Sequence, residues 1–120
     1  MTEVATLSPG ENVDQTVTLL HVREIDRYNS WVLAHLRPFL AGRILEFGCG
    51  IGTYSALIRR AGKSMCCVDM EAQYVKRVRR VFRADPDVSV VLGALPDDIE
   101  FRSGSFDTIV CLNVLEHIVR

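Results

Sequence analysis

The sequence predicts an α/β fold in which a parallel sheet carries helices on both faces. Short apolar runs, typical of buried strands, alternate along the chain with segments of helical periodicity. A glycine-rich turn follows the first apolar run, and an acidic residue follows the second. Right-handed crossovers between such units give the strand order 3-2-1-4, and sheets of this kind bind ligands where the order reverses.

Length, charge and cysteine content narrow the class of protein. The chain has 120 residues, which suits one domain, and its net charge of −1 gives no general attraction to nucleic acid or to an anionic membrane. No apolar run is long enough to span a membrane and the start lacks a signal-like pattern, so we expect a cytoplasmic protein. The four cysteines have no zinc-ligand spacing, so we expect small buried side chains and no metal site.

The N-terminal third of the chain precedes the first strand. Residues 1–14 are polar with little periodicity, and we expect a flexible arm. Apolar residues then recur at steps of three and four, which predicts a helical lid over residues 15–41. Asn29 or Ser30 could divide this segment into two helices, and Pro38 and Gly42 are expected to end it.

Residues 42–120 show the alternation on which the fold prediction depends. Strands are expected at residues 44–47, 64–68, 88–92 and 106–111, and helices at 53–60, at 71–83 and from 113 onward. The strand at 64–68 is apolar on both faces, as a central parallel strand should be. The helix at 71–83 has a basic face expected to be solvated and an apolar side made of Tyr74, Val75, Val78, Val81 and Phe82.

A glycine turn and a preceding acid form the first part of the candidate site. Gly48, Gly50 and Gly52 are spaced G-x-G-x-G, whereas the third glycine of the NAD fingerprint comes one residue later. Such a turn brings backbone close to a ligand and points a helix N-terminus at it. Glu46 lies one residue before the end of the first strand, where a carboxylate suits a positively charged ligand and suits a pyrophosphate badly.

A second acid, Asp69, directly follows the second strand, 17 residues beyond Gly52. An acid at this place can accept hydrogen bonds from both hydroxyls of a ribose. The alternative is that Asp69 is the N-cap of the helix that starts near Glu71. Glu71 itself is a rival for ribose binding, although a carboxylate in the first turn of a helix also favours the helix dipole.

Together these motifs resemble the class I methyltransferases that depend on S-adenosylmethionine (SAM). ILEFGCGIG is similar to their first motif, VDM to the acidic end of their second strand, and SFDTIVCLNVLEHI to their fourth strand and next helix. RYNSWVLAHLRPFL is similar to the helix before the first motif in bacterial small-molecule methyltransferases of type 12. The resemblance implies a Rossmann-like fold, SAM as cofactor and a small-molecule methyl acceptor, with no nucleic-acid or membrane partner.

The resemblance also implies a role for each matching residue. Glu46 would orient the SAM amino group, Asp69 would hold the ribose hydroxyls, and Met70 would pack on the adenine. The turn backbone and Asn113 would contact the methionine part, Tyr28 would reach its carboxylate, and Ala94 and Leu95 would bind the adenine through their backbone. The full set expected near the cofactor is Tyr28, Glu46, Gly48, Cys49, Gly50, Gly52, Asp69, Met70, Ala94, Leu95 and Asn113.

Two positions leave alternatives open. Ala94 stands where the family usually has an adenine-binding acid, and Asp97 or Asp98 could substitute for it. Losing one hydrogen bond there would weaken binding by about 0.5–1.5 kcal/mol. His117 is a weak candidate for a catalytic base, because methyl transfer from a sulfonium is a direct displacement that positioning alone can accelerate.

The family normally has three further strands after the fourth, and they carry much of the acceptor site. We therefore expect a cofactor-binding fragment truncated before those strands, with its own catalytic activity left open. An apolar edge made of Ile109, Val110 and Cys111 would then favour self-association through the fourth strand or its neighbouring helix. One alternative is a non-catalytic SAM-binding or assembly module. The other is an NAD-dependent oxidoreductase, which Glu46 and the glycine spacing disfavour.

Overall fold

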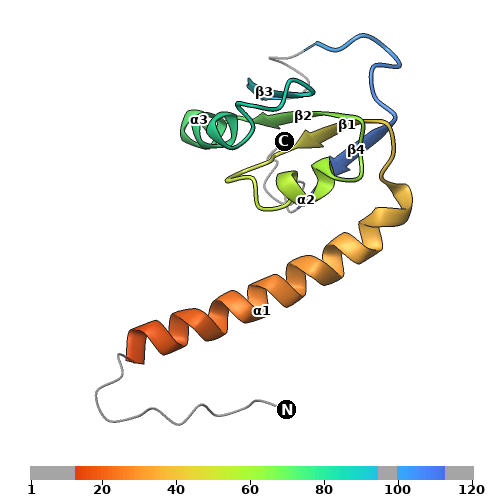
Figure 1. Ribbon diagram of the computed structural model, residues 1–120. Helices are drawn as coiled ribbons and strands as arrows, with labels where there is room; N and C mark the ends of the chain where they lie inside the picture. Colours follow the sequence, from red (N-terminus) through yellow and green to blue (C-terminus); the bar gives the residue numbers. More distant parts are fainter. Residues whose placement is uncertain (1–12, 95–99, 113–120) are drawn as a thin grey trace, which may run out of the picture.

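The described part of the chain is built on one four-stranded parallel sheet. The computed structural model describes the backbone of residues 13–94 and 100–112, and side chains from His21 onward apart from Val22. The strand order is β3-β2-β1-β4, as predicted (Figure 1). The strands are β1 (Arg43–Phe47), β2 (Ser64–Asp69), β3 (Val88–Leu92) and β4 (Thr108–Cys111).

The register brings the carboxyl ends of the parallel strands to one edge of the sheet. β1 pairs in parallel with β2 and with β4, and Glu46 lies opposite both Cys67 and Val110. β2 also pairs in parallel with β3, where Asp69 lies opposite Leu92. Because parallel strands end at the same edge, the two acids expected to bind a ligand lie near the same end of the sheet.

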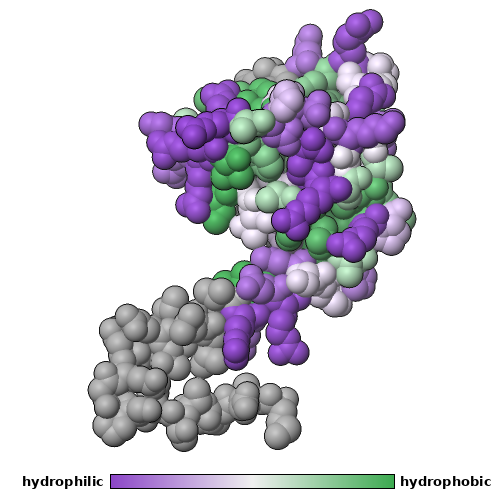
Figure 2. All heavy atoms as spheres, viewed as in Figure 1, coloured by the Kyte–Doolittle hydropathy of each residue, from purple (hydrophilic) through white to green (hydrophobic). Residues whose placement is uncertain are grey.

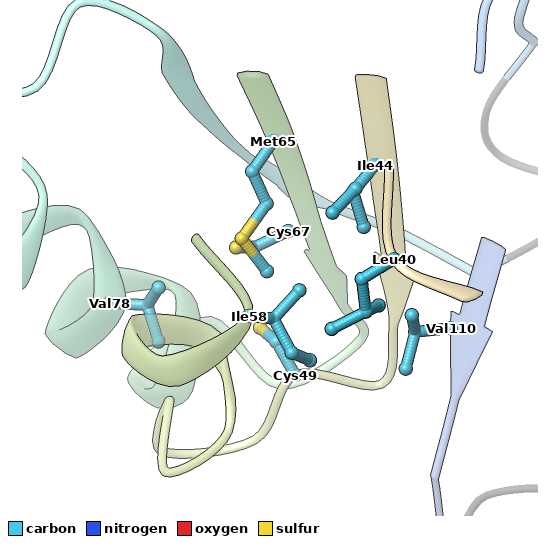
Figure 3. Packing of buried hydrophobic residues seen from close by; sticks show 8 residues of the cluster. All are labelled: Leu40, Ile44, Cys49, Ile58, Met65, Cys67, Val78 and Val110. Carbon is cyan, nitrogen blue, oxygen red and sulfur yellow. The ribbon is translucent and has the colours of Figure 1, made fainter. Parts of the chain in front are cut away.

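One face of the sheet forms the main core with helices α2 (Ser55–Arg59) and α3 (Ala72–Val81). Ile58 from α2 and Val78 from α3 are fully buried there. The whole cluster, shown in Figure 3, contains Leu40, Ile44, Cys49, Ile58, Met65, Cys67, Val78 and Val110. The opposite face has a smaller cluster, and the helix expected beyond β4 starts outside the described residues.

The N-terminal helix settles one alternative that the sequence left open. α1 (Val13–Leu36) is continuous, so neither Asn29 nor Ser30 marks the break that the sequence allowed. Neither residue restricts the backbone as proline does. Asn and Ser can both occupy an exposed position inside a helix at a small cost in free energy. The chain turns instead at the 3₁₀ helix η1 (Arg37–Phe39), which carries Pro38 in its first turn. In Figure 1, α1 extends away from the sheet, and its last residues approach the core.

Two apolar side chains lie where the sequence did not place them. Val81 was expected on the buried side of α3 but is 58% exposed. At 3.6 residues per turn it lies about 120° around the helix from Val75, which is buried. Val110 was expected on an exposed edge of β4, yet it packs in the main core, and only its neighbour Ile109 is largely exposed. The basic face of α3 is exposed as predicted, and hydrophilic residues cover this helix in Figure 2.

The amino ends of β1 and β4 are closed by polar contacts. The backbone N–H of Arg43 donates to Asp107 Oδ2 at 2.9 Å, and Asp107 also receives a hydrogen bond from the Arg43 side chain. Thr108 Oγ1 donates to the carbonyl of Ala41 at 2.9 Å. Gly42 has a φ of +64°, and a Cβ there would lie 2.3 Å from Asp107 Oδ2. Only glycine therefore fits this corner without displacing the carboxylate.

Three of the four cysteines are buried as expected, and Cys111 is partly buried. Cys49, Cys66 and Cys67 are buried and all four cysteines are free thiols. Two main effects raise the pKa of the Cys67 thiol: the larger is its interaction with Cys49, and the second is burial. No described helix is both long and apolar enough to cross a membrane. Within residues 13–94 and 100–112, no group of three or more potential ligands could hold a metal ion.

Candidate functional site

The glycine turn after β1 is held against the end of β2. The backbone N–H groups of Gly48 and Cys49 both donate to the carbonyl of Val68, at 2.8 and 3.0 Å. Gly48, Gly50 and Gly52 have φ values of +76°, +54° and +86°, a region that side chains disfavour. A Cβ at Gly50 would meet nothing within 4 Å, whereas one at Gly52 would lie 3.2 Å from a Val78 methyl. The turn is thus packed beneath Gly52 and open above Gly50.

Asp69 ties this turn to the start of α3. Its Oδ2 accepts a hydrogen bond from the Gly50 N–H at 2.9 Å, and its Oδ1 accepts one from the Glu71 N–H at 2.9 Å. The residue that caps α3 is Glu71, and no side chain provides the cap hydrogen bond, so Asp69 fixes the turn before the helix. A carboxylate can accept about four hydrogen bonds, which leaves acceptor capacity for a ligand.

Glu46 is a buried acid with an incomplete set of partners. Its side chain is 4% exposed, and Oε1 accepts a hydrogen bond from Ser55 Oγ at 2.8 Å. Oε2 is buried and has no hydrogen-bond partner among the described residues. Burial raises the pKa of Glu46 to about 7; the Ser55 hydrogen bond opposes this rise, and the nearby Asp69 adds to it. A cationic donor reaching Oε2 would satisfy the free oxygen and favour the ionised form.

The side chains expected at the edges of the site are accessible. Met70, directly after β2, is 68% exposed, so its thioether is free to pack against a planar group. Tyr28 on α1 is 53% exposed and its ring stacks with Trp31 at a centroid distance of 6.2 Å. Burial and, less strongly, the nearby Tyr28 raise the pKa of Tyr54, the residue before α2.

The structure places some predicted residues together and leaves others undescribed. Ala94 follows β3 and is partly buried, and the N–H of neighbouring Gly93 donates to the carbonyl of Asp69 at 3.0 Å. This contact brings the end of β3 beside the acid expected to bind ribose. Leu95, Asn113 and His117, with Asp97 and Asp98, lie outside the described residues, so their predicted roles stay predictions.

Ser55 is a site residue that the sequence analysis missed. It is the first residue of α2, is fully buried, and is the partner of the Glu46 carboxylate. Its position nine residues after Glu46 is visible in the sequence, but a serine at the start of a helix is commonly a capping residue. Only the shape of the glycine turn shows that this hydroxyl points back to the strand.

These features fit the SAM cofactor implied by the sequence. Glu46 Oε2 offers an unpaired buried acceptor for an ammonium group, and the open side of Gly50 leaves room for a ligand near it. Asp69 can still accept from hydroxyl groups, and Met70 is exposed beside it. Within the described part of the chain, no cationic side chain forms an ion pair with Glu46 and so competes with a ligand for it.

Comparison with known proteins agrees with this geometry. The chain is 32% identical over 90 residues to a ubiquinone biosynthesis O-methyltransferase of Xanthomonas axonopodis pv. citri, covering 73% of this chain and 37% of that protein. It is 27% identical over 110 residues to the ribosomal RNA small subunit methyltransferase C of a Shewanella species, covering 90% of this chain and 31% of the relative. The chain thus spans about a third of the length of these curated relatives.

A solved structure shares the fold. The S-adenosylmethionine-dependent methyltransferase from Mesorhizobium loti superposes with a TM-score of 0.57 at 23% identity, covering 69% of this chain and 39% of that one. The family described as methyltransferase domain matches residues 44–120, from β1 through the glycine turn to the end of the chain. The chain therefore belongs to the methyltransferase domain family, of the class I kind that the first motif predicted.

Proposed function

We propose that this chain forms the SAM-binding part of a methyltransferase that acts on a small-molecule acceptor. The observation that carries the proposal is Glu46, a buried carboxylate beside an open glycine turn, with one oxygen that no described residue contacts by a hydrogen bond. Leaving such an oxygen unpaired costs free energy, and a bound ammonium group would recover it. The family match supports the same cofactor.

Each residue of the site would bind a different part of the cofactor. Glu46 would bind the amino group, and Asp69 would accept the ribose hydroxyls while its bond to Gly50 keeps the turn in shape. Met70 would cover the adenine. When bound, SAM supplies a methyl group on a positively charged sulfur, ready for direct displacement. The task of the chain is then to hold that methyl group in place and to exclude water from it.

The acceptor class is proposed from charge and from relatives. A net charge of −1 offers no general attraction to RNA. The ubiquinone biosynthesis O-methyltransferase is the more similar of the two relatives compared, at 32% against 27% identity. An O-methyltransferase acts on a hydroxyl, so we propose a small hydroxylated compound as acceptor, and the ribosomal RNA relative defines the competing possibility.

Calorimetry tests cofactor binding directly. Wild-type chain is titrated with S-adenosylhomocysteine and, separately, with NAD. We expect saturable heat with the homocysteine compound and none with NAD, and the opposite result would overturn the proposal. Asp69→Asn should weaken binding by about tenfold, because hydrogen bonds to a charged group contribute about 1.5–3 kcal/mol. Asp107→Asn, an acid-to-amide change at the opposite end of the sheet, is the matched control and should leave binding unchanged.

A transfer assay then addresses the acceptor. The chain is incubated with SAM carrying a labelled methyl group, together with either a catechol or ribosomal RNA. Label in the catechol supports the small-molecule acceptor, and label in the RNA alone contradicts it. Cofactor binding with no transfer to either acceptor would favour a SAM-binding module that is not catalytic.

A further inference from the structure

The buried side of the candidate site depends on one hydroxyl group. Ser55 is fully buried at the start of α2, and its Oγ donates to Glu46 Oε1 at 2.8 Å. The second carboxylate oxygen, Oε2, has no partner among the described residues. The two oxygens are therefore differentiated by the protein itself: one is held, and the other is left free.

We propose that Ser55 is a positioning residue for cofactor binding, whose hydroxyl fixes the Glu46 carboxylate so that Oε2 points a free, charged acceptor at the amino group of the cofactor. The inference rests on the proposed function and deepens it. Ser55 would contact neither the cofactor nor the reacting atoms, and its effect on binding would pass through Glu46.

The surroundings of Glu46 explain why a single hydroxyl has such influence. β2 presents the Cys67 thiol opposite Glu46 and the Asp69 carboxylate at its end, and neither group stabilises a negative charge. The Cys49 thiol, from the glycine turn, raises the pKa of the Cys67 thiol, and the Ser55 hydroxyl lowers it. β4 contributes the apolar Val110 opposite Glu46. Ser55 is the donor that favours ionisation of Glu46, and its hydrogen bond lowers a pKa that burial raises to about 7.

Removing the hydroxyl should therefore change both the orientation and the charge of Glu46. Without Ser55 Oγ, neither carboxylate oxygen would have a hydrogen-bond donor, and the acid would be protonated over a wider pH range. A protonated carboxyl attracts an ammonium group far less strongly than a carboxylate does. Ligands that carry the amino group should lose affinity, while ligands without it should not.

The test compares two ligands on the same variants. S-adenosylhomocysteine carries the amino group, whereas 5′-methylthioadenosine has the adenine, ribose and sulfur but lacks it. We expect Ser55→Ala to weaken binding of S-adenosylhomocysteine by about tenfold, the loss of one hydrogen bond to a charged group, and to leave 5′-methylthioadenosine within about twofold. Equal weakening of both ligands would show a merely structural role and would overturn the inference.

A pH series provides a second readout. In wild-type chain, affinity for S-adenosylhomocysteine should rise as the pH increases through about 7, because Glu46 becomes ionised. In Ser55→Ala the midpoint of this rise should move to higher pH, since the hydrogen bond that lowers the pKa is gone. An unchanged midpoint would contradict the proposal.

A double variant shows whether Ser55 acts through Glu46. In a Glu46→Gln background, adding Ser55→Ala should change the ratio of the two affinities by less than about twofold, because the charge is already absent.

If Ser55→Ala does not fold, Ser55→Cys replaces it, since a thiol is a weaker donor of similar shape. The same selective loss is expected, and an equal loss for both ligands again overturns the inference. Failure of wild-type chain to bind either ligand would overturn the proposed function itself.

Discussion

Gly42 and Gly50 occupy opposite ends of β1 and have similar backbone angles, yet their surroundings differ completely. At the amino end, a Cβ on Gly42 would collide with Asp107 at 2.3 Å. At the carboxyl end, a Cβ on Gly50 would meet nothing within 4 Å. The first glycine is required by packing inside the protein, and the second leaves space that the described protein atoms do not fill.

The acids at the two ends differ in the same way. Asp107 receives hydrogen bonds from the backbone and side chain of Arg43, and these contacts hold the pKa of its carboxyl below the usual range. Among the described residues Glu46 has one donor, Ser55, and burial raises the pKa of Glu46 to about 7. Asp107 at the amino end has hydrogen-bond donors from Arg43, whereas Glu46 Oε2 at the carboxyl end has no partner among the described residues. This difference supports the proposal that the ligand binds at the carboxyl end.

The largest expected effect is on the pH dependence of stability. The pKa of Glu46 rises from 4.5 to about 7 on folding, so its contribution is fully present below about pH 4.5 and is lost as the pH rises through 7. Without ligand, the free energy of unfolding should be on the order of 2–3 kcal/mol lower at pH 8 than at pH 5. Urea denaturation at the two pH values measures the difference.

The control for this experiment is Glu46→Gln, which should remove most of the pH dependence. Asp85 and Asp107 have lowered pKa values, so their stabilising effect is lost only as the pH falls below about their ordinary value of 3.8, outside this window. If wild-type chain and Glu46→Gln had the same pH profile, Glu46 would not be the buried acid described.

The next effect concerns the packed glycine. Gly42→Ala should lower the free energy of unfolding by at least about 1–2 kcal/mol, the cost of a left-handed backbone for an ordinary residue, and the displacement of Asp107 adds to this. Thermal or urea denaturation measures the loss. The fraction that remains folded should bind S-adenosylhomocysteine as wild type does, and a specific loss of binding at intact stability would contradict this assignment.

Gly50→Ala should have the opposite pattern, with a smaller loss of stability and a larger loss of ligand affinity. Its backbone cost is similar or smaller, about 1 kcal/mol, and no collision adds to it. The new methyl group would enter the open side of the turn, so binding of S-adenosylhomocysteine should weaken by about tenfold or more. Calorimetry at matched folded concentration measures the change, and unaltered affinity would place the ligand elsewhere.

The smallest effect is expected at the amino end. Thr108→Val keeps the shape of the side chain but removes the hydroxyl that donates to the Ala41 carbonyl. The hydroxyl also accepts from the Ala41 N–H, but these contacts are exposed and water can replace them, so the loss of stability should be only about 0.5–1 kcal/mol. Affinity for the cofactor should not change. A change in affinity would show that the two ends of the sheet are coupled.

Local patterns in the sequence predicted the features that depend on few residues. Apolar runs located the four strands, and crossover geometry gave their order. The positions of Glu46 and Asp69 beside the glycine turn predicted a ligand site, and the structure places both acids near the same end of the sheet. Neither the Ser55–Glu46 bond nor the Asp69–Gly50 bond could be predicted, because each depends on the three-dimensional path of the turn. The burial of Val110 likewise depends on which face of β4 meets α2.

The most direct test follows the backbone amides at both ends of the sheet during one titration. Amide chemical shifts of the labelled chain are recorded while S-adenosylhomocysteine is added. We expect saturable shifts at Gly48, Gly50 and Met70, with the amide signals of Gly42 and Thr108 unchanged. Saturable shifts confined to the amino end, or no saturable shift at the glycine turn, would contradict the claim that the carboxyl end is the cofactor site.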